Sequence, residues 1–339
     1  MNRLRPFNFR QAPCTGLLHA ALLTIVIGAC VTHFFGEQGE VHLRADKATS
    51  LSAKHSTLSL FLCDFQIVYD GNNPVDYISN LRMLDRSRQP LTVDEGSLRM
   101  NKPLKYHGWR FCQSDYDSDE LGVVLAYNFD PWGIGITYTG YALLLFAMIG
   151  FFFQKRTYFR TLIQKQHTWL MVGLGITVVA LAIVMTKVVT PKPPLQPVLQ
   201  TPLLGIHVSV IMLAYTLFAI IAVNGIVGLC LPKRREQLMH LSQLLLYPAL
   251  FCLTAGIFIG AVWANMSWGR YWGWDPKETW ALITMLVYAL LLHFPWLKLI
   301  KTPSSVVVYH VCAVVAFAFV LFTYFGVNRL LGGLHSYAN

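Results

Sequence analysis

Charged residues are scarce in this sequence of 339 amino acids. Asp, Glu, Lys and Arg make up 13% of the residues and hydrophobic residues make up 55%, whereas an average soluble domain contains about 25% charged residues. The composition excludes an ordinary soluble protein and indicates a membrane protein. The sequence also lacks internal repeats and low-complexity stretches, which argues against a repeat architecture.

The cysteine motifs of redox and haem-carrying proteins are absent as well. Seven cysteines are present, but no CxxC or CxxCH occurs, which argues against thiol redox cycling and against a haem attached covalently to this chain. Five cysteines lie in or at the ends of apolar stretches, and Cys63 and Cys112 lie between the first two stretches. These two form a disulfide in an oxidising compartment or are two partly buried thiols, and both alternatives stay open.

Seven windows of about 20 apolar residues are long enough to cross a hydrocarbon core of about 30 Å. The windows are residues 16–35, 133–153, 169–189, 205–231, 241–263, 280–300 and 305–326. The stretch between the first two, with strand-like runs at residues 59–69 and 122–127 and a turn at residues 70–74, predicts a small β domain. The predicted fold class is an α-helical polytopic membrane protein with about seven transmembrane helices and one small external β-rich domain.

The predicted domains follow from these windows. Residues 1–36 form an N-terminal arm and the first helix, and residues 37–131 form the external β domain. Residues 132–166 form the second helix and a cytoplasmic loop, and residues 167–339 form a helical domain with a tryptophan-rich loop at residues 263–280.

Lys and Arg collect in stretches that lie on one side of a membrane crossed seven times. They are Arg3, Arg5, Arg10, Lys155, Arg156, Arg160, Lys165, Lys233, Arg234, Arg235, Lys298 and Lys301. Because cytoplasmic loops retain positive charge, we expect the N-terminus in the cytoplasm and the C-terminus outside. The net charge of +10 is then explained by topology rather than by nucleic-acid binding. We expect a bacterial cytoplasmic membrane, while a thylakoid membrane would give the same pattern.

The first window has an alternative interpretation as a signal peptide. A basic arm precedes it, and Ile27-Gly-Ala-Cys30 faintly resembles a lipoprotein cleavage box. The apolar run reaches Phe35 without a break, however, and cleavage would leave an even number of spans and disturb the charge pattern. We therefore predict that the window remains as the first transmembrane helix.

Histidines inside apolar windows mark candidate sites, because an ionisable group in a bilayer is costly and usually functional. His19 and His293 both reach the depth of the inner leaflet, and His207 and His335 both lie near the outer face. A haem with a histidine on each axial side needs one such pair. Two pairs at two depths would bind haem once near the inner face and once near the outer face.

Depth alone does not establish these pairs. His310 also lies at inner depth, and His33 lies at the outer end of the first window, so each is a rival ligand. A membrane b-type cytochrome or quinone oxidoreductase is a second class of function, because His19 and His33 are 14 residues apart on one predicted helix. Such a protein needs a second helix with the same spacing, and none exists in the sequence.

A tryptophan-rich loop, WGRYWGWDPKETW, separates the fifth and sixth windows. An interfacial aromatic belt explains one or two of its indoles, whereas a platform for a planar apolar ligand explains all of them. Asp275 followed by Pro276, with Glu278 three residues after the cap, predicts the start of a helix. The tryptophans are Trp268, Trp272, Trp274 and Trp280.

This loop resembles the WWD signature of haem-handling proteins, in the version found in the CcsA (ResC) component of the system II cytochrome c synthase. The segments around His207, His293 and His335 resemble those around the histidines of that family. The first half, around His19 and over residues 102–117, resembles the partner component CcsB (ResB), in the form fused to CcsA.

This sequence departs from the family pattern at three places. Position 33 is His where the family has Arg, and Phe294-Pro295 follows His293 where a basic residue is usual. The ResB-like half also looks shortened. These departures concern the inner site and the ability of the chain to act alone.

The resemblance implies a cytochrome c biogenesis protein that moves haem b across the membrane and acts as a holocytochrome c synthase on the CxxCH of apocytochrome c. It acts alone or with a further ResB-like subunit and thiol-reducing partners. A haem exporter or chaperone would use the same residues and stays an alternative. The implied iron ligands and haem-binding residues are His19, His293, His207, His335, Trp268, Trp272, Trp274, Asp275 and Trp280.

The remaining polar residues of the loop have smaller expected roles. Asp275 and Glu278 are interpreted mainly as structural residues of the helix start, and Lys277 as a partner for a haem propionate. No residue has the pattern of a separate general base.

Overall fold

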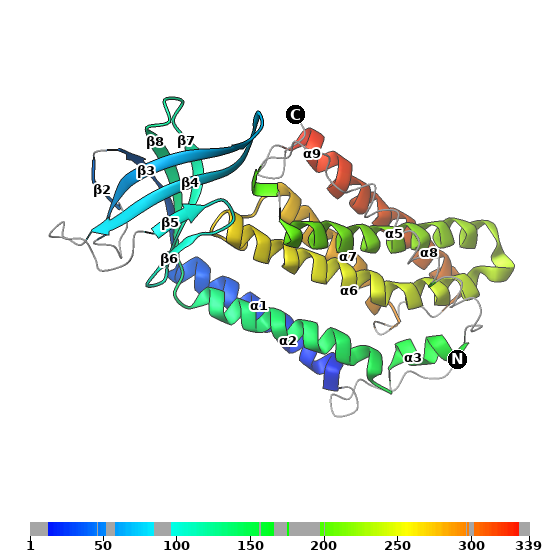
Figure 1. Cartoon of the computed structure of the whole chain (residues 1–339). Coiled ribbons are helices and arrows are strands. Elements are labelled where there is room, and N and C mark those ends of the chain that lie inside the picture. The colour runs from blue at the N-terminus through cyan, green and yellow to red at the C-terminus, as the bar shows by residue number, and fades with distance from the viewer. Residues whose placement is uncertain are drawn as a thin grey trace.

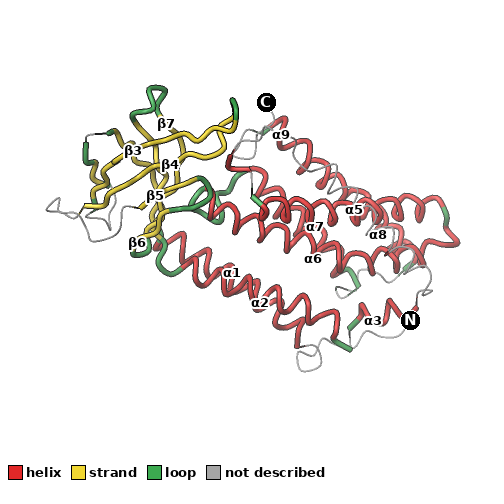
Figure 2. The backbone as a smooth tube through the Cα atoms, in the orientation of Figure 1, coloured by secondary structure: helices red, strands yellow, loops and turns green. Residues whose placement is uncertain are grey.

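The computed structural model describes residues 13–45, 47–51, 58–84, 96–155, 157–165, 175, 197–199, 201–295, 297 and 302–331. Strands gather at one end of the molecule and helices extend away from them (Figures 1 and 2). The predicted third span, residues 169–189, lies outside the described residues except for Gly175.

The strands form two four-stranded antiparallel sheets, with the orders β1-β8-β7-β6 and β2-β3-β4-β5. In β1, Val41 and Leu43 are buried while their neighbours His42 and Arg44 are exposed, the alternation of a strand with one face on a core. The predicted β-rich domain is thus confirmed, and it is a sandwich, because Leu43 shares one core with Leu60 of the other sheet. The strands are β1 Glu37–Arg44, β2 Thr49–Ser50, β3 Ser59–Asp70, β4 Asn73–Leu84, β5 Gly96–Arg99, β6 Leu104–Tyr106, β7 Trp109–Tyr116 and β8 Gly122–Phe129.

Five helices of the described chain, α1, α2, α5, α6 and α8 with its continuation, are long and apolar enough to cross a membrane. Helix α7 contains most of the predicted sixth span; it is 18 residues long, begins beside Lys277 and Glu278, and is not among those five. The helices are α1 Pro13–Phe35, α2 Gly133–Phe153, α3 Tyr158–Lys165, η2 Pro197–Leu199, α5 Pro202–Cys230, η3 Pro232–Arg234, α6 Arg235–Ser267, α7 Pro276–His293, α8 Pro303–Leu321, η4 Phe322–Gly326 and α9 Val327–Leu330. The polytopic helical class is thereby confirmed.

Helices α5, α6, α7 and α8 pack around one apolar core (Figure 1). Phe218 of α5 and Tyr288 of α7 are fully buried there and stack with ring centroids 3.7 Å apart. Helices α1 and α2 form a separate antiparallel pair, and Phe251 and Phe258 of α6 pack against it. Helix α6 therefore joins the bundle to the α1–α2 pair.

The α1–α2 pair depends on close approach of the two backbones. A Cβ atom at Gly28 would lie 2.7 Å from the backbone nitrogen of Thr137, so α2 lies where any larger residue would be. Small residues at helix contacts are typical of membrane proteins, where dispersion packing rather than the hydrophobic effect holds helices together.

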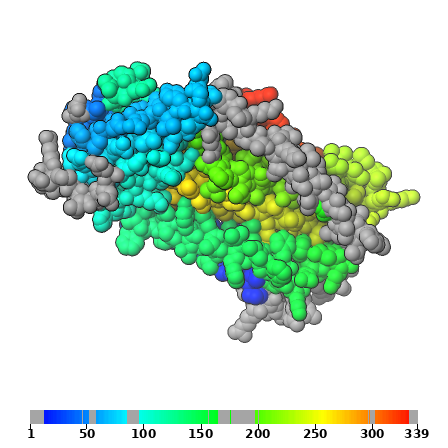
Figure 3. Space-filling view, viewed as in Figure 1, coloured from blue at the N-terminus to red at the C-terminus, as the bar shows by residue number. Residues whose placement is uncertain are grey.

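The sandwich and the tryptophan-rich loop lie at the same end of the molecule. Asn128 of β8 donates a hydrogen bond to the carbonyl oxygen of Gly269 in the loop, and α9 reaches the same end (Figure 1). In Figure 3 yellow atoms of α6 are visible between α2 and α5 beside the cyan sandwich. The α5–α6 turn, with Lys233 and Arg234, lies at the opposite end, as the distribution of positive charge led us to expect.

Gly28→Ala is expected to lower the midpoint of thermal unfolding in detergent. The added methyl group overlaps Thr137, and overpacking of this kind costs about 1–3 kcal/mol. The matched control is Gly135→Ala in α2, where a Cβ meets nothing within 4 Å, and this variant should unfold at or slightly above the wild-type midpoint. Equal midpoints for the two variants would contradict the close approach of α1 and α2.

Candidate functional site

Two of the predicted ligands meet at the end of the helices far from the sandwich. His19 of α1 and His293, the last residue of α7, have ring centroids 6.2 Å apart and ring planes at 83°. Two imidazoles that bind one metal from opposite sides, with metal–nitrogen bonds of about 2.0 Å, have centroids about 6 Å apart. The separation of the two ring centroids therefore matches that of two imidazoles bound to one iron atom.

The described candidate ligands share one orientation of the imidazole. In each, Nδ1 lies at a backbone carbonyl oxygen, so that Nδ1–H donates, and in the neutral ring Nε2 then carries the lone pair. This second contact fixes the tautomer and ring direction of metal-binding histidines and raises their basicity. The contacts are His19 to Thr15 (2.8 Å), His293 to Ala289 (2.7 Å) and His207 to Gly256 (2.7 Å).

His207 belongs to the other end of the molecule, where α5 begins. Its ring lies against α6, and a Cβ atom at Gly260 would be 2.6 Å from the ring carbon Cε1. Only glycine leaves room for the imidazole at this place. Helix α6 ends soon after, at Ser267, so the tryptophan-rich loop and the support of His207 are parts of one helix and its continuation.

The two rival histidines have different surroundings. His310 is fully buried, its Nε2 lies 2.9 Å from the carbonyl oxygen of Arg235, and its Nδ1 has no hydrogen-bond partner among the described residues. Its ring thus ties α8 to the α5–α6 turn and is oriented opposite to the other three. His33 lies in the last turn of α1, remote from His19, where its ring contacts Phe34.

The polar residues of the loop form the predicted start of α7. Asp275 is the N-cap and accepts a hydrogen bond from the backbone nitrogen of Lys277 at 2.9 Å. Glu278 accepts from the backbone nitrogens of Gly273 (2.8 Å) and Asp275 (3.3 Å). The capping box is confirmed, and the buried Asp275 carboxylate shapes the loop through it.

The four tryptophans do not form a single stack. Trp272 and Trp274 stand at 89° to each other with centroids 5.8 Å apart, so a planar ligand lying on one indole meets the other edge-on. Trp274 is 69% exposed and has φ +55°, a strained conformation that is concentrated at functional sites. Trp268 packs on Trp263 at 4.8 Å and Trp280 packs on Phe322 at 4.3 Å.

The second external ligand stays a prediction, because His335 lies outside the described residues. The described chain ends at Leu331, just after α9, and Lys277 donates a hydrogen bond from Nζ to Asn328 of α9 at 3.0 Å. The residue interpreted as a propionate partner thus joins the start of α7 to the segment that precedes His335.

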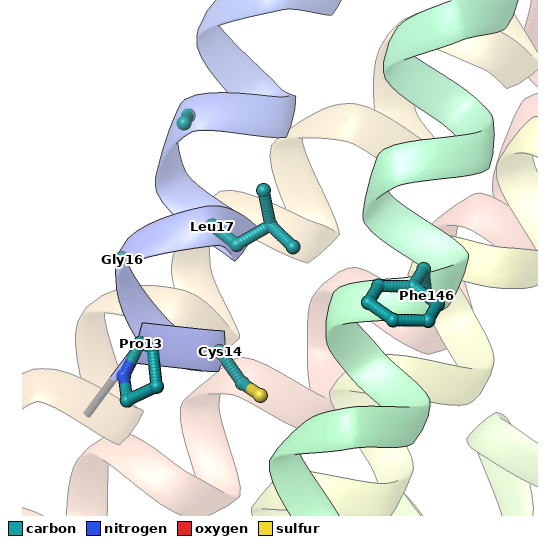
Figure 4. A pocket seen from close by; sticks show the side chains of 6 residues that line it. Pro13, Cys14, Gly16, Leu17 and Phe146 are labelled. Atoms are coloured by element: carbon teal, nitrogen blue, oxygen red, sulfur yellow. The ribbon is translucent and has the colours of Figure 1, made fainter.

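An apolar cavity of about 530 Å³ opens beside the first turns of α1 (Figure 4). Its lining contains no histidine, so it is separate from the His19–His293 pair. The lining residues are Pro13, Cys14, Gly16, Leu17, Ala20 and Phe146.

Sequence reasoning missed the groups that hold the histidines. Backbone carbonyls carry no sequence signal, but Gly256 and Gly260 form a GxxxG pattern in an apolar helix, which marks a close helix contact. That pattern would have indicated where α5, and hence His207, approaches α6.

Comparison with known proteins defines the class. Residues 135–335 match the family model described as cytochrome C assembly protein, and residues 14–132 match the ResB-like family. The first match covers more than half of the chain, and the chain belongs to the cytochrome c assembly protein family. We name residues 14–132 the ResB-like part and residues 135–335 the assembly part. The resemblance to a fused two-component cytochrome c biogenesis protein is confirmed.

Individual relatives agree with this membership. The chain is 42% identical over 155 residues to Protein NrfI of Wolinella succinogenes, which covers 42% of this chain and 17% of that protein. It is 40% identical over 155 residues to the cytochrome c biogenesis protein CcsA of Chlamydomonas reinhardtii (42% and 43%) and 46% identical over 104 residues to that of Spinacia oleracea (31% and 31%). The chain thus matches less than half the length of each of these relatives.

Cys112 is expected to resist alkylation at neutral pH. Burial raises the pKa of its thiol to about 12 from 9.0, which lowers the reactive thiolate fraction about a thousandfold. Cys63 is exposed and provides the control in the same molecule. Peptide mapping after brief treatment with N-ethylmaleimide should find Cys63 modified and Cys112 modified only after denaturation.

Equal modification of the two cysteines in the folded protein would contradict the burial of Cys112. Both residues are thiols in the structure. The disulfide alternative has its own signature, since it would leave both unmodified until reduction.

Proposed function

We propose that this protein binds haem b between His19 and His293, moves it to the opposite end of the helices, and presents it between His207 and His335 at the tryptophan-rich loop. The observation that carries the proposal is the His19–His293 pair. One imidazole comes from the ResB-like part and the other from the assembly part, with ring centroids 6.2 Å apart. Two distant segments converge on the spacing that one haem iron needs.

The chemistry of the inner pair agrees with a haem ligand set. Histidine at membrane depth is costly unless it has partners, and the carbonyl oxygens of Thr15 and Ala289 satisfy one nitrogen of each ring. A neutral imidazole with its Nδ1–H donated to a carbonyl is a stronger ligand through Nε2. Haem is the substrate of the reaction. Two neutral imidazoles would stabilise the positive charge of its iron through their Nε2 lone pairs.

The attachment step is an addition. Each thiol of the CxxCH motif of apocytochrome c adds across one vinyl group of the haem: a carbon–sulfur bond forms and the thiol hydrogen passes to the other vinyl carbon. No group leaves and no oxidant is consumed. The protein contributes orientation, with histidines at the iron and Trp272 and Trp274 at the ring, and orientation of this kind can lower a barrier by several kcal/mol.

The proposal includes partners and a location. Only reduced thiols can add to a vinyl group, so a thiol-reducing partner is part of it, and a further ResB-like subunit is a candidate to complete the inner site. The proposed location is the bacterial cytoplasmic membrane, with the N-terminus in the cytoplasm and the loop and C-terminus outside. The histidine of CxxCH would then replace one external ligand as the product leaves.

Holocytochrome c synthase activity is tested in a bacterial host that lacks its own synthases. Co-expression of the full chain with an apocytochrome c should give a product that keeps its haem under denaturing conditions, because thioether bonds survive unfolding. His207→Ala is expected to reduce the product at least about tenfold, the loss typical of a damaged metal site, whereas His240→Ala, outside both proposed sites, should not.

Haem bound to the wild-type protein without any covalent product would contradict the synthase and favour a haem exporter or chaperone. An equal yield from His207→Ala and His240→Ala would contradict the role of His207.

A further inference from the structure

Alternate residues at the end of α6 and in the loop after it are held by hydrogen bonds from outside the bundle. Four consecutive contacts follow this pattern, and we name them the seam. In the seam, Asn265 donates to the hydroxyl of Tyr138 (2.6 Å), Ser267 donates to the side-chain oxygen of Asn101 (2.6 Å), Asn128 donates to the carbonyl of Gly269 (2.8 Å), and Tyr271 donates to the hydroxyl of Thr32 (2.7 Å).

Three of these contacts join the two family segments. Asn101, Asn128 and Thr32 belong to the ResB-like part, and their partners belong to the assembly part. They come from three different elements of the ResB-like part: the β5–β6 turn, strand β8 and the last turns of α1. The loop is therefore held from several directions by the other half of the chain.

The seam is buried, which makes its hydrogen bonds costly to lose. Asn128, Ser267 and Tyr271 are 8%, 3% and 5% exposed. A buried donor or acceptor without a partner loses its hydration and gains nothing in return. Burial also raises the pKa of the Tyr271 hydroxyl, so it stays protonated and remains a donor.

The contact at Tyr271 continues into the junction between the sandwich and the helices. Thr32 donates to Oδ2 of Asp130 at 2.6 Å, and Oδ1 of Asp130 accepts from the backbone nitrogen of Gly133 at 2.7 Å. Gly133 is the first residue of α2. One chain of hydrogen bonds therefore runs from the loop through the end of α1 to the start of α2.

The contact at Gly269 is also steric. Its φ is +74°, and a Cβ atom would lie 3.1 Å from the sulfur of Cys112 on β7. The loop backbone thus lies directly on the sandwich in a conformation that favours glycine. A displacement of the sandwich at this point displaces the loop with it.

We infer that the ResB-like part sets the position of the tryptophan-rich loop, with Asn128 and Thr32 as positioning residues for the site that the loop forms. Trp272 directly follows Tyr271 in the loop, whereas His207 contacts α6 further from the loop, at Gly256, so a shift of the loop changes the distance between indole and imidazole. The effect of the loop position on bound haem rests on the proposed function, whereas the hydrogen bonds of the seam are independent of it.

The first test measures the seam without haem. Hydrogen exchange of the amides of residues 266–278 is followed in the full-length protein for wild type, Asn128→Ala and Thr32→Val. Thr32→Val keeps the shape of the side chain and replaces only the hydroxyl, so the packing around this position is retained and the variant is expected to fold. Both variants should exchange severalfold faster in this segment, and the control Asn72→Ala, at an exposed turn, should match the wild type.

The second test measures the consequence for haem. The absorption spectrum of bound haem and the yield of covalently attached cytochrome should both change in Asn128→Ala and Thr32→Val, and Thr32→Ser, which restores the hydroxyl, should return them to the wild-type values. A purely structural role of Thr32 would change stability without a spectral change that Thr32→Ser reverses.

The two tests fail in distinguishable ways. Unchanged exchange in both variants overturns the inference whether or not the protein binds haem. Faster exchange with unchanged spectrum and yield also overturns it, because the loop position would then not matter for haem. A wild-type protein that takes up no haem would end the proposed function and the positioning role for haem, and the exchange measurement would still decide whether the ResB-like part holds the loop.

Discussion

An imidazole inside a membrane needs a hydrogen-bond partner for its N–H group, because the hydrocarbon core offers no water. The proposed haem path depends on how that need is met. In His19, His207 and His293 a backbone carbonyl lies at Nδ1, which leaves Nε2 as the nitrogen for the proposed iron bond. In His310 the carbonyl lies at Nε2 instead, and the ring acts as a contact between helices. The ring nitrogen that lies at the carbonyl thus distinguishes the three proposed ligands from His310.

The two family segments contact each other at both ends of the helices. At the far end, the ResB-like part contributes His19 and the assembly part contributes His293. Near the sandwich, the ResB-like part holds the loop through Asn101, Asn128 and Thr32. Neither end is complete within one segment. The proposed inner and outer sites therefore both require the two parts to be assembled.

Features encoded by neighbouring residues could be predicted from the sequence. Apolar length located the long helices of the described residues, and α2 has the predicted bounds, residues 133–153. The Asp275-Pro276 cap was also predicted, because caps depend on residues within one turn. The β domain was predicted from alternating strands and turn residues. These signals are local and do not depend on how the two parts pack.

Contacts across the fold could not be predicted in the same way. From their depth, His19 and His293 were predicted at the same level in the membrane, with His310 as a rival ligand. Only the packing of α8 against the α5–α6 turn distinguishes His310 from that pair. The seam escaped sequence reasoning because asparagine, threonine and serine are common in loops, and the two residues of each contact lie 127 to 239 positions apart in the sequence. The edge-to-face arrangement of Trp272 and Trp274, at a residue with a left-handed backbone conformation, likewise has no signal in the sequence.

The central claim is that His19 and His293 bind one haem together. The most direct measurement is the absorption spectrum, before and after dithionite, of the purified full-length protein in which His207→Ala and His335→Ala remove the proposed outer ligands. Low-spin bis-imidazole bands are expected in this protein, and they should disappear when either His19 or His293 is also replaced by alanine. Bands that survive replacement of both residues, or a colourless protein that cannot be reconstituted with haem, would contradict this claim.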